Sequence, residues 1–245
     1  MVKNYFFDKY LYEYLTFLKD IKNLSNNSIK AYERDISKFR DFIALNNVNK
    51  LIDISEDICT AWIGSLYSEN ISSRSIQRHL SSIKGLFKYL QKNNLIGSSP
   101  LELITGPKTE KKLPETLTPE QINKLLDFKP NSTLEIRDLA IVELMYSSGL
   151  RVSETANVDI NDFEEDMNFL RVLGKGSKTR LVPLGRFAIS AIKNWLGERN
   201  KITNKDDALF INIAGGRLTT RSIQLRLKRL AVKQGLPPIN PHMLR

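Results

Sequence analysis

Apolar residues repeat at helical spacing through the first hundred positions of the chain. Four stretches carry them at steps of three or four residues, which places the side chains on one face of an α-helix. The four faces are marked by Leu11, Leu15 and Leu18; by Ile29, Tyr32, Ile36, Phe39 and Ile43; by Ile58, Trp62 and Leu66; and by Ile76, Leu80, Ile83, Phe87 and Leu90. Four helices with short connections predict a compact helical bundle over residues 1–105.

The helical pattern stops at residues 106–117. This segment has two prolines, mixed charge and no periodicity, which is typical of an exposed linker. Thr118 then has the features of a helix cap, with Pro119 in the first turn and Gln121 three residues after the cap. The sequence therefore predicts two domains, residues 1–105 and 118–245, joined by a linker.

The second half mixes helical periodicity with short β-type runs. A Gly-containing turn between two of these runs predicts a β-hairpin, and Gly149 is expected to end a helix. Helices are expected at 136–148, 187–195 and 220–232, and strands at 169–173, 180–183 and 208–211. The predicted fold class is mainly α with a small β-sheet (α+β).

The amino-acid composition indicates that the protein has a polyanionic partner. Of the 245 residues, 37 are Lys or Arg and 27 are Asp or Glu, which gives a net charge of +10. Lys and Arg release condensed counterions when they meet nucleic-acid phosphates. A membrane surface is the competing polyanion, but no apolar run is long enough to span a bilayer, and the apolar helical faces are needed for the cores.

The single cysteine, Cys59, excludes an intrachain disulfide framework and a cysteine-rich zinc site. It lies in an apolar helical pattern and is expected to be a small buried hydrophobic residue. The N-terminus lacks the long apolar core of a signal peptide. These features favour a protein of the reducing cytoplasm that has no membrane partner.

Two tracts concentrate the positive charge. Between Glu69 and Glu102 no acidic residue occurs, and from Ala208 to the end there is none either. The first tract contains Arg74, Arg78, Lys84, Lys88 and Lys92; the second contains Arg217, Arg221, Arg226, Lys228, Arg229, Lys233 and Arg245. Either tract could be an ordinary solvated face, but such faces usually mix signs. Two basic surfaces on two domains suggest a clamp around duplex DNA, in which phosphate contacts position the protein without reading sequence.

Three short segments contain residues suited to phosphate chemistry. Arg151 follows Gly149 at the end of a helix, where it is either a favourable helix-end charge or a phosphate ligand. Glu154, one turn later, could hold Arg151 through a charge-assisted hydrogen bond. Lys175 lies in the hairpin turn Gly174–Arg180, where it is either a solvated turn residue or a group that reaches a DNA groove; the segment lacks the spacing of a nucleotide-binding phosphate loop.

The third segment is Pro241–Arg245. His242 and Arg245 are three residues apart, so on a helix they share a face and could approach one phosphate. The other histidine, His79, lies in the basic helix and is either structural or phosphate-facing.

Three motifs resemble the tyrosine recombinase (phage integrase) family. In chain order they are Gly-Leu-Arg-x-Ser-Glu, Gly-Lys-Gly-x-Lys-x-Arg between two strands, and Pro-His-x-Leu-Arg. The resemblance covers nearly the whole chain, because residues 25–32 and 72–76 look like the helical core-binding domain of that family. Within the family the XerC/XerD group, which resolves chromosome dimers, is the most similar. Residues 206–210 and 233–236 look more like the XerC side of that group.

The resemblance implies a role for each matching residue. Arg151, Arg245 and His242 would surround the scissile phosphate, and Lys175 would protonate the leaving 5′ oxygen. A tyrosine attacks in this family and forms a 3′-phosphotyrosyl link, and no metal or cofactor takes part. Other DNA contacts are expected from Arg74, Arg78, Lys84, Lys88, Lys178, Arg180 and Arg221.

In the family, His-x-x-Arg is followed by a second His or Trp, then the nucleophilic Tyr, then a tail that docks on a neighbouring protomer, and all three are missing from this sequence. Its eight tyrosines all lie between Tyr5 and Tyr146, so none follows His242. The expectation is that the nucleophile is absent and that this chain alone cannot cleave DNA. The expected partners are a double-stranded recombination site and, for a full-length protein, a cyclic tetramer with a second Xer-type recombinase and a DNA translocase.

Two alternatives remain open. The first is a non-catalytic DNA-binding protein of the same fold. The second is a relative of the type IB topoisomerases, although the helical N-terminal domain and the short linker favour the recombinase.

Overall fold

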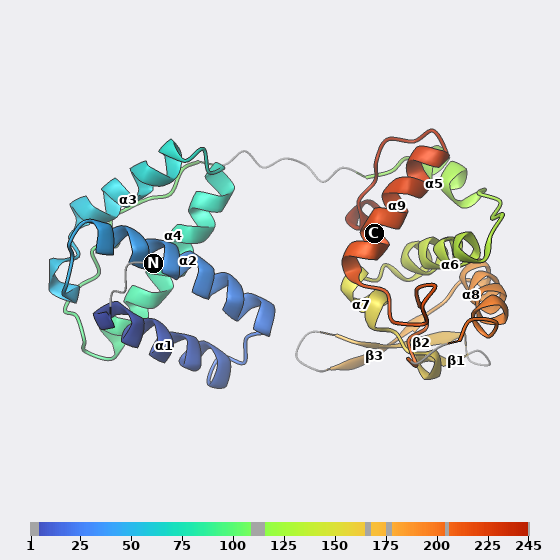
Figure 1. The fold of residues 1–245 in the computed structure, drawn as a ribbon, viewed down its shortest axis with the longest axis horizontal. Helices are drawn as coiled ribbons and strands as arrows, with labels where there is room; N and C mark the ends of the chain where they lie inside the picture. Colours follow the sequence, from blue (N-terminus) through green and yellow to red (C-terminus); the bar gives the residue numbers. More distant parts are fainter. Residues whose placement is uncertain (1–4, 109–115, 165–167, 175–177, 204–205, 245) are drawn as a thin grey trace. The chain divides into compact units, whose positions relative to one another are not determined.

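The computed structural model describes residues 5–108, 116–164, 168–174, 178–203 and 206–244. The chain divides into two compact units, residues 1–112 and 113–245 (Figure 1). The division falls inside the segment 106–117 that was expected to be a linker. Each unit is described by itself.

The first unit is the predicted bundle of four α-helices. They are α1 (Tyr5–Asp20), α2 (Asn26–Leu45), α3 (Glu56–Ser68) and α4 (Ser73–Lys92), with a short 3-10 turn η1 (Leu51–Asp53) before α3. Ser25, Ser55 and Ser72 begin α2, α3 and α4, and each side chain accepts a hydrogen bond from the backbone N–H three residues later. These caps satisfy N–H groups that have no partner inside the helix.

The apolar faces predicted from the sequence meet in the core of this unit. The rings of Phe39 and Trp62 pack edge to face with centroids 4.9 Å apart, and Cys59 is fully buried. Gly85 on α4 permits a close approach of α1, because a Cβ atom there would lie 2.5 Å from the Tyr14 hydroxyl oxygen. A larger residue at position 85 would therefore require the Tyr14 side chain to move.

The second unit surrounds helix α6 (Thr133–Ser148). Its other helices are α5 (Pro119–Leu126), α7 (Val152–Asn157), α8 (Arg186–Arg199) and α9 (Thr220–Lys233), with 3-10 turns η2 (Ile160–Asp162) and η3 (Pro241–Leu244). Thr118 and Gln121 form the predicted capping box at the start of α5. Gly149 ends α6 in the left-handed conformation with φ of 60°, which glycine adopts without a steric cost.

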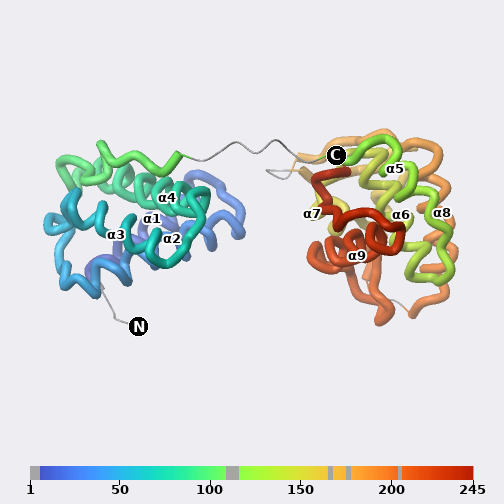
Figure 2. Tube along the Cα trace, turned by 90° about the horizontal axis from the view of Figure 1, so that it is seen from above, coloured from blue at the N-terminus to red at the C-terminus, as the bar shows by residue number. Residues whose placement is uncertain are grey.

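Helix α6 packs against both α8 and α9, and Figure 2 shows it between them. Its buried residues join those of α8 and α9 in one core that includes Trp195 and Phe210. Turn η3 also packs against α6. The C-terminal segment that carries His242 is therefore held on the same helix that leads into Arg151.

A three-stranded antiparallel sheet lies beside these helices, in the order β1 (Phe163–Glu164), β2 (Phe169–Leu173) and β3 (Thr179–Pro183). The predicted β2–β3 hairpin is confirmed, whereas β1 was not predicted. The Gly174 N–H donates to the Lys178 carbonyl oxygen at 2.8 Å. This bond continues the ladder up to the hairpin loop.

The strand predicted at 208–211 is wrong as a sheet strand. The segment is fully buried, but Leu209 and Phe210 form a bend, and the pairing is limited to isolated bridges from Ala208 to Asp159 and from Ile211 to Arg217. Three of its carbonyl groups accept instead from side chains: Ala208 from Arg199 at 3.0 Å, Leu209 from Trp195 at 2.7 Å and Ile211 from Arg137 at 2.9 Å. Local sequence cannot reveal partners that come from α6 and α8.

Candidate catalytic and DNA-binding site

Arg151 lies at the junction between the two helices that carry the Gly149–Glu154 motif. Helix α6 ends at Gly149, and Arg151 occupies the N-cap position of α7. Its side chain remains 51% exposed. The sharp turn therefore presents the guanidinium group at the surface while its backbone is fixed by two helix ends.

Glu154 connects Arg151 to the hairpin. Its carboxylate accepts from the Arg151 N–H at 2.8 Å and from Arg151 Nη1 at 3.2 Å, so the predicted contact between the two residues is present. It also pairs with Nη2 of Arg180 on β3 at 3.1 Å. Burial raises the pKa of Glu154, but the hydrogen bonds from Arg180 and Arg151 outweigh it, and the net pKa lies below the ordinary value. Glu154 is therefore an anionic bridge between two surface arginines.

The candidate lysine lies outside the described residues, but its flanks are placed. Gly174 closes the ladder before it, and a Cβ atom at Gly174 would come within 2.9 Å of Nη1 of Arg180. Arg180 is in turn bound to Glu154. The described end of the hairpin therefore leads to the same cluster as Arg151, while Lys178 is exposed.

His242 lies in turn η3, and its imidazole is exposed. The His242 N–H donates to Oδ1 of Asn240 at 3.0 Å, and the neighbouring Pro241 and Leu244 are buried. These contacts fix the backbone around His242. Arg245 lies outside the described residues, so of the four catalytic candidates the structure places Arg151 and His242.

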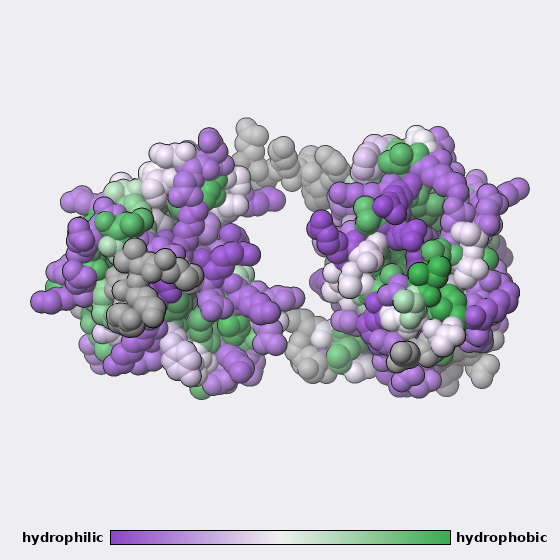
Figure 3. Space-filling model, viewed as in Figure 1, coloured by the Kyte–Doolittle hydropathy of each residue, from purple (hydrophilic) through white to green (hydrophobic). Residues whose placement is uncertain are grey.

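A hollow of about 300 Å³ lies next to His242, between α9 and the segment before η3. It is lined by Arg221, Gln224, Leu225, Lys228, Asn240 and Pro241. Hydrophilic residues cover part of the surface over α9 (Figure 3), and Leu225 and Val232 are exposed on the same helix. Arg221 and Lys228 have no ion-pair partner among the described residues, so their positive charges face solvent.

The second basic tract is less free than its sequence suggests. Arg217 pairs with Asp159 and with Asp206, the latter at 2.9 Å. Arg226 lies 3.7 Å from Asp138, and Lys233 pairs with Glu135. Acids on other elements therefore neutralise three of the six basic side chains between Arg217 and Lys233, so this surface is not free of acids. In the described part of the chain, Arg221, Lys228 and Arg229 keep an unpaired charge.

The basic helix α4 shows the same division. Arg78 binds both carboxylate oxygens of Asp35, and Lys84 Nζ donates to the Ile104 carbonyl oxygen at 2.7 Å. Arg74 and Lys88 are exposed, with no partner among the described residues. His79 is buried, so its structural interpretation is the correct one. Sequence reasoning missed Asp35, because its partners lie 43 or more residues further along the chain.

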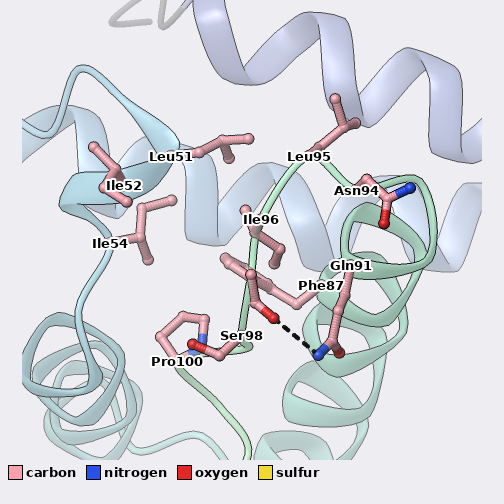
Figure 4. A pocket seen from close by; sticks show the side chains of 11 residues that line it. Leu51, Ile52, Ile54, Phe87, Gln91, Asn94, Leu95, Ile96, Ser98 and Pro100 are labelled. Carbon is pink, nitrogen blue, oxygen red and sulfur yellow. Dashed lines mark hydrogen bonds between the residues drawn. The ribbon is translucent and has the colours of Figure 1, made fainter.

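Another hollow in the first unit, of about 710 Å³, lies away from these side chains. Its walls come from η1, the end of α4 and the following turn, with Leu51, Ile54, Phe87 and Ile96 facing it (Figure 4). The Gln91 amide donates to the Gly97 carbonyl oxygen at 3.3 Å across one edge. Its lining carries no charged residue, so it does not extend the basic surface.

Two further observations describe what the site contains. In the described ranges, no group of three or more His, Cys, Asp or Glu side chains is arranged to hold a metal ion. Within the same ranges, none of the helices combines the length and the apolar character needed to cross a membrane.

The order of the motifs and the two-unit fold define a class of protein. The sequence profile of the phage integrase family matches residues 115–245, and that of the phage integrase N-terminal SAM-like domain matches residues 11–94. The chain belongs to the phage integrase family, the tyrosine recombinases that act in DNA recombination.

Its curated relatives include tyrosine recombinases XerC. That of Actinobacillus succinogenes is 37% identical over 96% of this chain and 80% of the relative, and that of Shewanella amazonensis is 35% identical over 96% and 79%. A solved XerH site-specific recombinase bound to its difH substrate is 25% identical, with a TM-score of 0.71 over 96% of this chain and 72% of that one. A lambda integrase dimer bound to a core site shares the fold at 17% identity, with a TM-score of 0.73 over 97% and 86% of the two chains.

Proposed function

We propose that the chain acts in site-specific DNA recombination through a 3′-phosphotyrosyl intermediate, and that Arg151, Lys175, His242 and Arg245 surround the scissile phosphate. The observation that carries this proposal is the cluster in which Glu154 holds Arg151 at the surface beside the end of the hairpin. A guanidinium group presents a planar pair of donors to two phosphate oxygens and stays charged at any working pH. Donors fixed before the reaction stabilise the charge that develops in the transition state.

Each of the other three residues has a role that suits its chemistry. Arg245 would supply a second guanidinium group, and His242 would donate a hydrogen bond to a phosphate oxygen. Lys175 would give a proton to the leaving 5′ oxygen, which requires a pKa lowered by neighbouring cations. The covalent protein–DNA link preserves the energy of the broken phosphodiester, so the reaction needs no nucleotide cofactor.

The finer assignment rests on the similarity to XerC. We infer that the biological reaction is the resolution of chromosome dimers in the cytoplasm. The partners would be a recombination site, a second Xer-type recombinase in a cyclic tetramer and a DNA translocase. The test is to incubate the two recombinases together with a plasmid that carries two candidate sites and to measure whether the plasmid is resolved into two circles.

The 245-residue polypeptide itself is proposed to bind DNA without cleaving it, because no tyrosine follows Tyr146. A nicked suicide substrate traps the covalent adduct of a tyrosine recombinase. We expect no adduct from this polypeptide, and an adduct from a chimera in which a tyrosine-bearing C-terminal segment of a XerC relative follows Arg245. An adduct formed by the polypeptide alone would refute the missing-nucleophile proposal.

In that chimera, Arg151→Ala should greatly reduce cleavage and leave binding nearly unchanged. Loss of one donor aimed at transition-state charge costs about 3–4 kcal/mol in the chemical step, roughly a 10²–10³-fold loss of rate. One phosphate contact among several is a small part of affinity. Lys175→Ala should regain activity on a substrate with a 5′-bridging phosphorothiolate, whose leaving group needs no proton. Without that recovery, the general-acid role of Lys175 would be wrong.

DNA binding by the second unit is proposed to use the unpaired cations of α9. Replacing Arg221, Lys228 and Arg229 with Ala should flatten the plot of log affinity against log salt by up to about 0.9 for each phosphate that the variant no longer neutralises. The matched control replaces Arg217, Arg226 and Lys233 with Ala. It removes the same charge, but from side chains that are already paired within the unit. Equal slopes for the two triple variants would contradict this surface.

A non-catalytic DNA-binding protein is the second candidate. The observation that favours it is again that no tyrosine follows Tyr146. The basic features described above would serve DNA binding equally well without cleavage. The chimera distinguishes the two candidates, because a binding protein without catalytic geometry would form no adduct even when a tyrosine is supplied.

A further inference from the structure

One carboxylate in the first unit is almost completely buried beneath a basic surface. Asp35 on α2 is 1% exposed. It accepts from Nη1 of Arg78 on α4 with both oxygens, and from the Ser82 hydroxyl at 3.1 Å. Nδ1 of His79 lies 3.4 Å away. Buried carboxylates require such partners, because an unpaired charge is costly to remove from water.

The contact with Asp35 uses only one nitrogen of the Arg78 guanidinium group. Its side chain remains 42% exposed, and Nη1 makes both bonds to Asp35. The Nε and Nη2 groups have no partner among the described residues. Arg78 is thus held at one corner of its guanidinium group while the remaining donors are available.

Arg40, also paired with acids in this unit, shows what a closed pair looks like. Nε and Nη2 of Arg40 donate to Asp41, and Nη1 donates to Asp8 at 2.9 Å. Its side chain is 15% exposed. Every corner of this guanidinium group is used within the unit, so Arg40 has a structural role only.

The surroundings of Asp35 carry excess positive charge. Arg34 lies at 4.0 Å from Asp35 and is 71% exposed, and Arg74 is exposed one helical turn before Arg78. Burial lowers the pKa of His79, and the nearby Asp35 only partly offsets this, so His79 is the neutral neighbour in the cluster. One buried acid of α2 therefore lies among several surface cations, and the stretch of α4 beside it has no acid of its own.

We propose that Asp35 is a positioning residue that fixes Arg78 in advance for one backbone phosphate of duplex DNA. This inference rests on the proposed DNA-binding function. An arginine fixed before binding loses less side-chain freedom when it meets a phosphate, and its fork suits two phosphate oxygens. Arg74, on the same helix face, would contact the same strand without such support.

The test is a double-mutant cycle on DNA affinity in the whole chain. Arg78→Gln should weaken duplex binding about tenfold and lower the salt slope by about 0.9, the value for one phosphate contact. Asp35→Asn should weaken binding several-fold, because Arg78 is no longer held. In the Arg78→Gln background, Asp35→Asn should have no further effect on affinity. A merely structural Asp35 would instead change unfolding and leave the affinity of the folded protein unchanged, which would overturn the proposal.

Arg78→Lys decides the matter even where Asp35→Asn fails to fold. Lysine keeps the charge, but its single ammonium group would be taken by Asp35, so we expect the salt slope of Arg78→Gln. Arg40→Gln, at an arginine already closed within the unit, should keep the salt slope of the unmodified chain. A normal slope for Arg78→Lys would refute the positioning role while DNA binding stands. Salt-independent binding by the unmodified chain would refute the proposed function itself.

Discussion

Replacing Glu154 with Ala should destabilise the second unit by about 2 kcal/mol. The change removes the acceptor for the Arg151 N–H at the start of α7, and loss of such a cap typically costs about 1 kcal/mol. It also removes the partner of two guanidinium groups. Because Arg151 is 51% and Arg180 43% exposed, solvent screens these pairs, and each contributes only about 0.5 kcal/mol.

The chain offers a direct assay for this prediction. It contains two tryptophans, Trp62 in the first unit and Trp195 in the second, and both are buried. In a Trp62→Phe background, Trp195 fluorescence follows urea unfolding of the second unit alone. The free energy of unfolding of Glu154→Ala and of Glu154→Gln can then be compared. Glu154→Gln should lose less, since glutamine can also cap a helix from this position.

The matched control is Glu143, a half-buried glutamate on α6 with no ion-pair partner in the described part of the chain. Burial alone raises its pKa, which means that folding disfavours its charge. Glu143→Gln should therefore be neutral or slightly stabilising at pH 7. A loss below about 0.5 kcal/mol for Glu154→Ala, the level of an ordinary surface change, would refute the bridging role of Glu154.

Three further outcomes follow from individual interactions. Burial is the main cause that lowers the pKa of His79 in the folded protein. Its contribution to stability is therefore present above the ordinary pKa of 6.5 and is lost as pH falls through the folded pKa. His79→Gln should remove this part of the pH dependence of unfolding, measured by Trp62 fluorescence. Gly149→Ala should cost about 1 kcal/mol in urea unfolding, because φ is 60° there. Lys84→Met should cost roughly 1 kcal/mol, because the Ile104 carbonyl loses its donor, and should leave the salt dependence of DNA binding unchanged.

The helices could be predicted because the apolar residues of each one repeat at helical spacing within that helix. The bundle in residues 1–105 and the helices around Gly149 and Thr118 depend on apolar spacing and caps within a few residues of each other. The two-residue strand β1 is too short to show alternation, and the buried segment 208–211 is held by side chains from α6 and α8. Only tertiary packing can specify those two.

The candidate site divides in the same way. Arg151 and Glu154 are three residues apart, so their contact could be inferred from one helical turn. Arg180 reaches Glu154 from 26 positions further on, and Asp35 reaches Arg78 across 43. The residue types suggested phosphate chemistry, but which acid holds which arginine is set by the fold.

Charge along a sequence and charge on a surface are therefore different quantities. The tract from Ala208 onward contains no acid, yet Arg217, Arg226 and Lys233 meet acids supplied by α6 and by the loops before α9. Pairing of this kind fixes a side chain within the unit and removes it from the set available to phosphates. Arg151 and Arg78 differ both from these paired cations and from the unpaired Arg221, Lys228 and Arg229, because an acid holds one part of the guanidinium group and solvent reaches the rest. For this chain, the half-bound state identifies two candidate DNA contacts that the density of basic residues along the sequence does not single out.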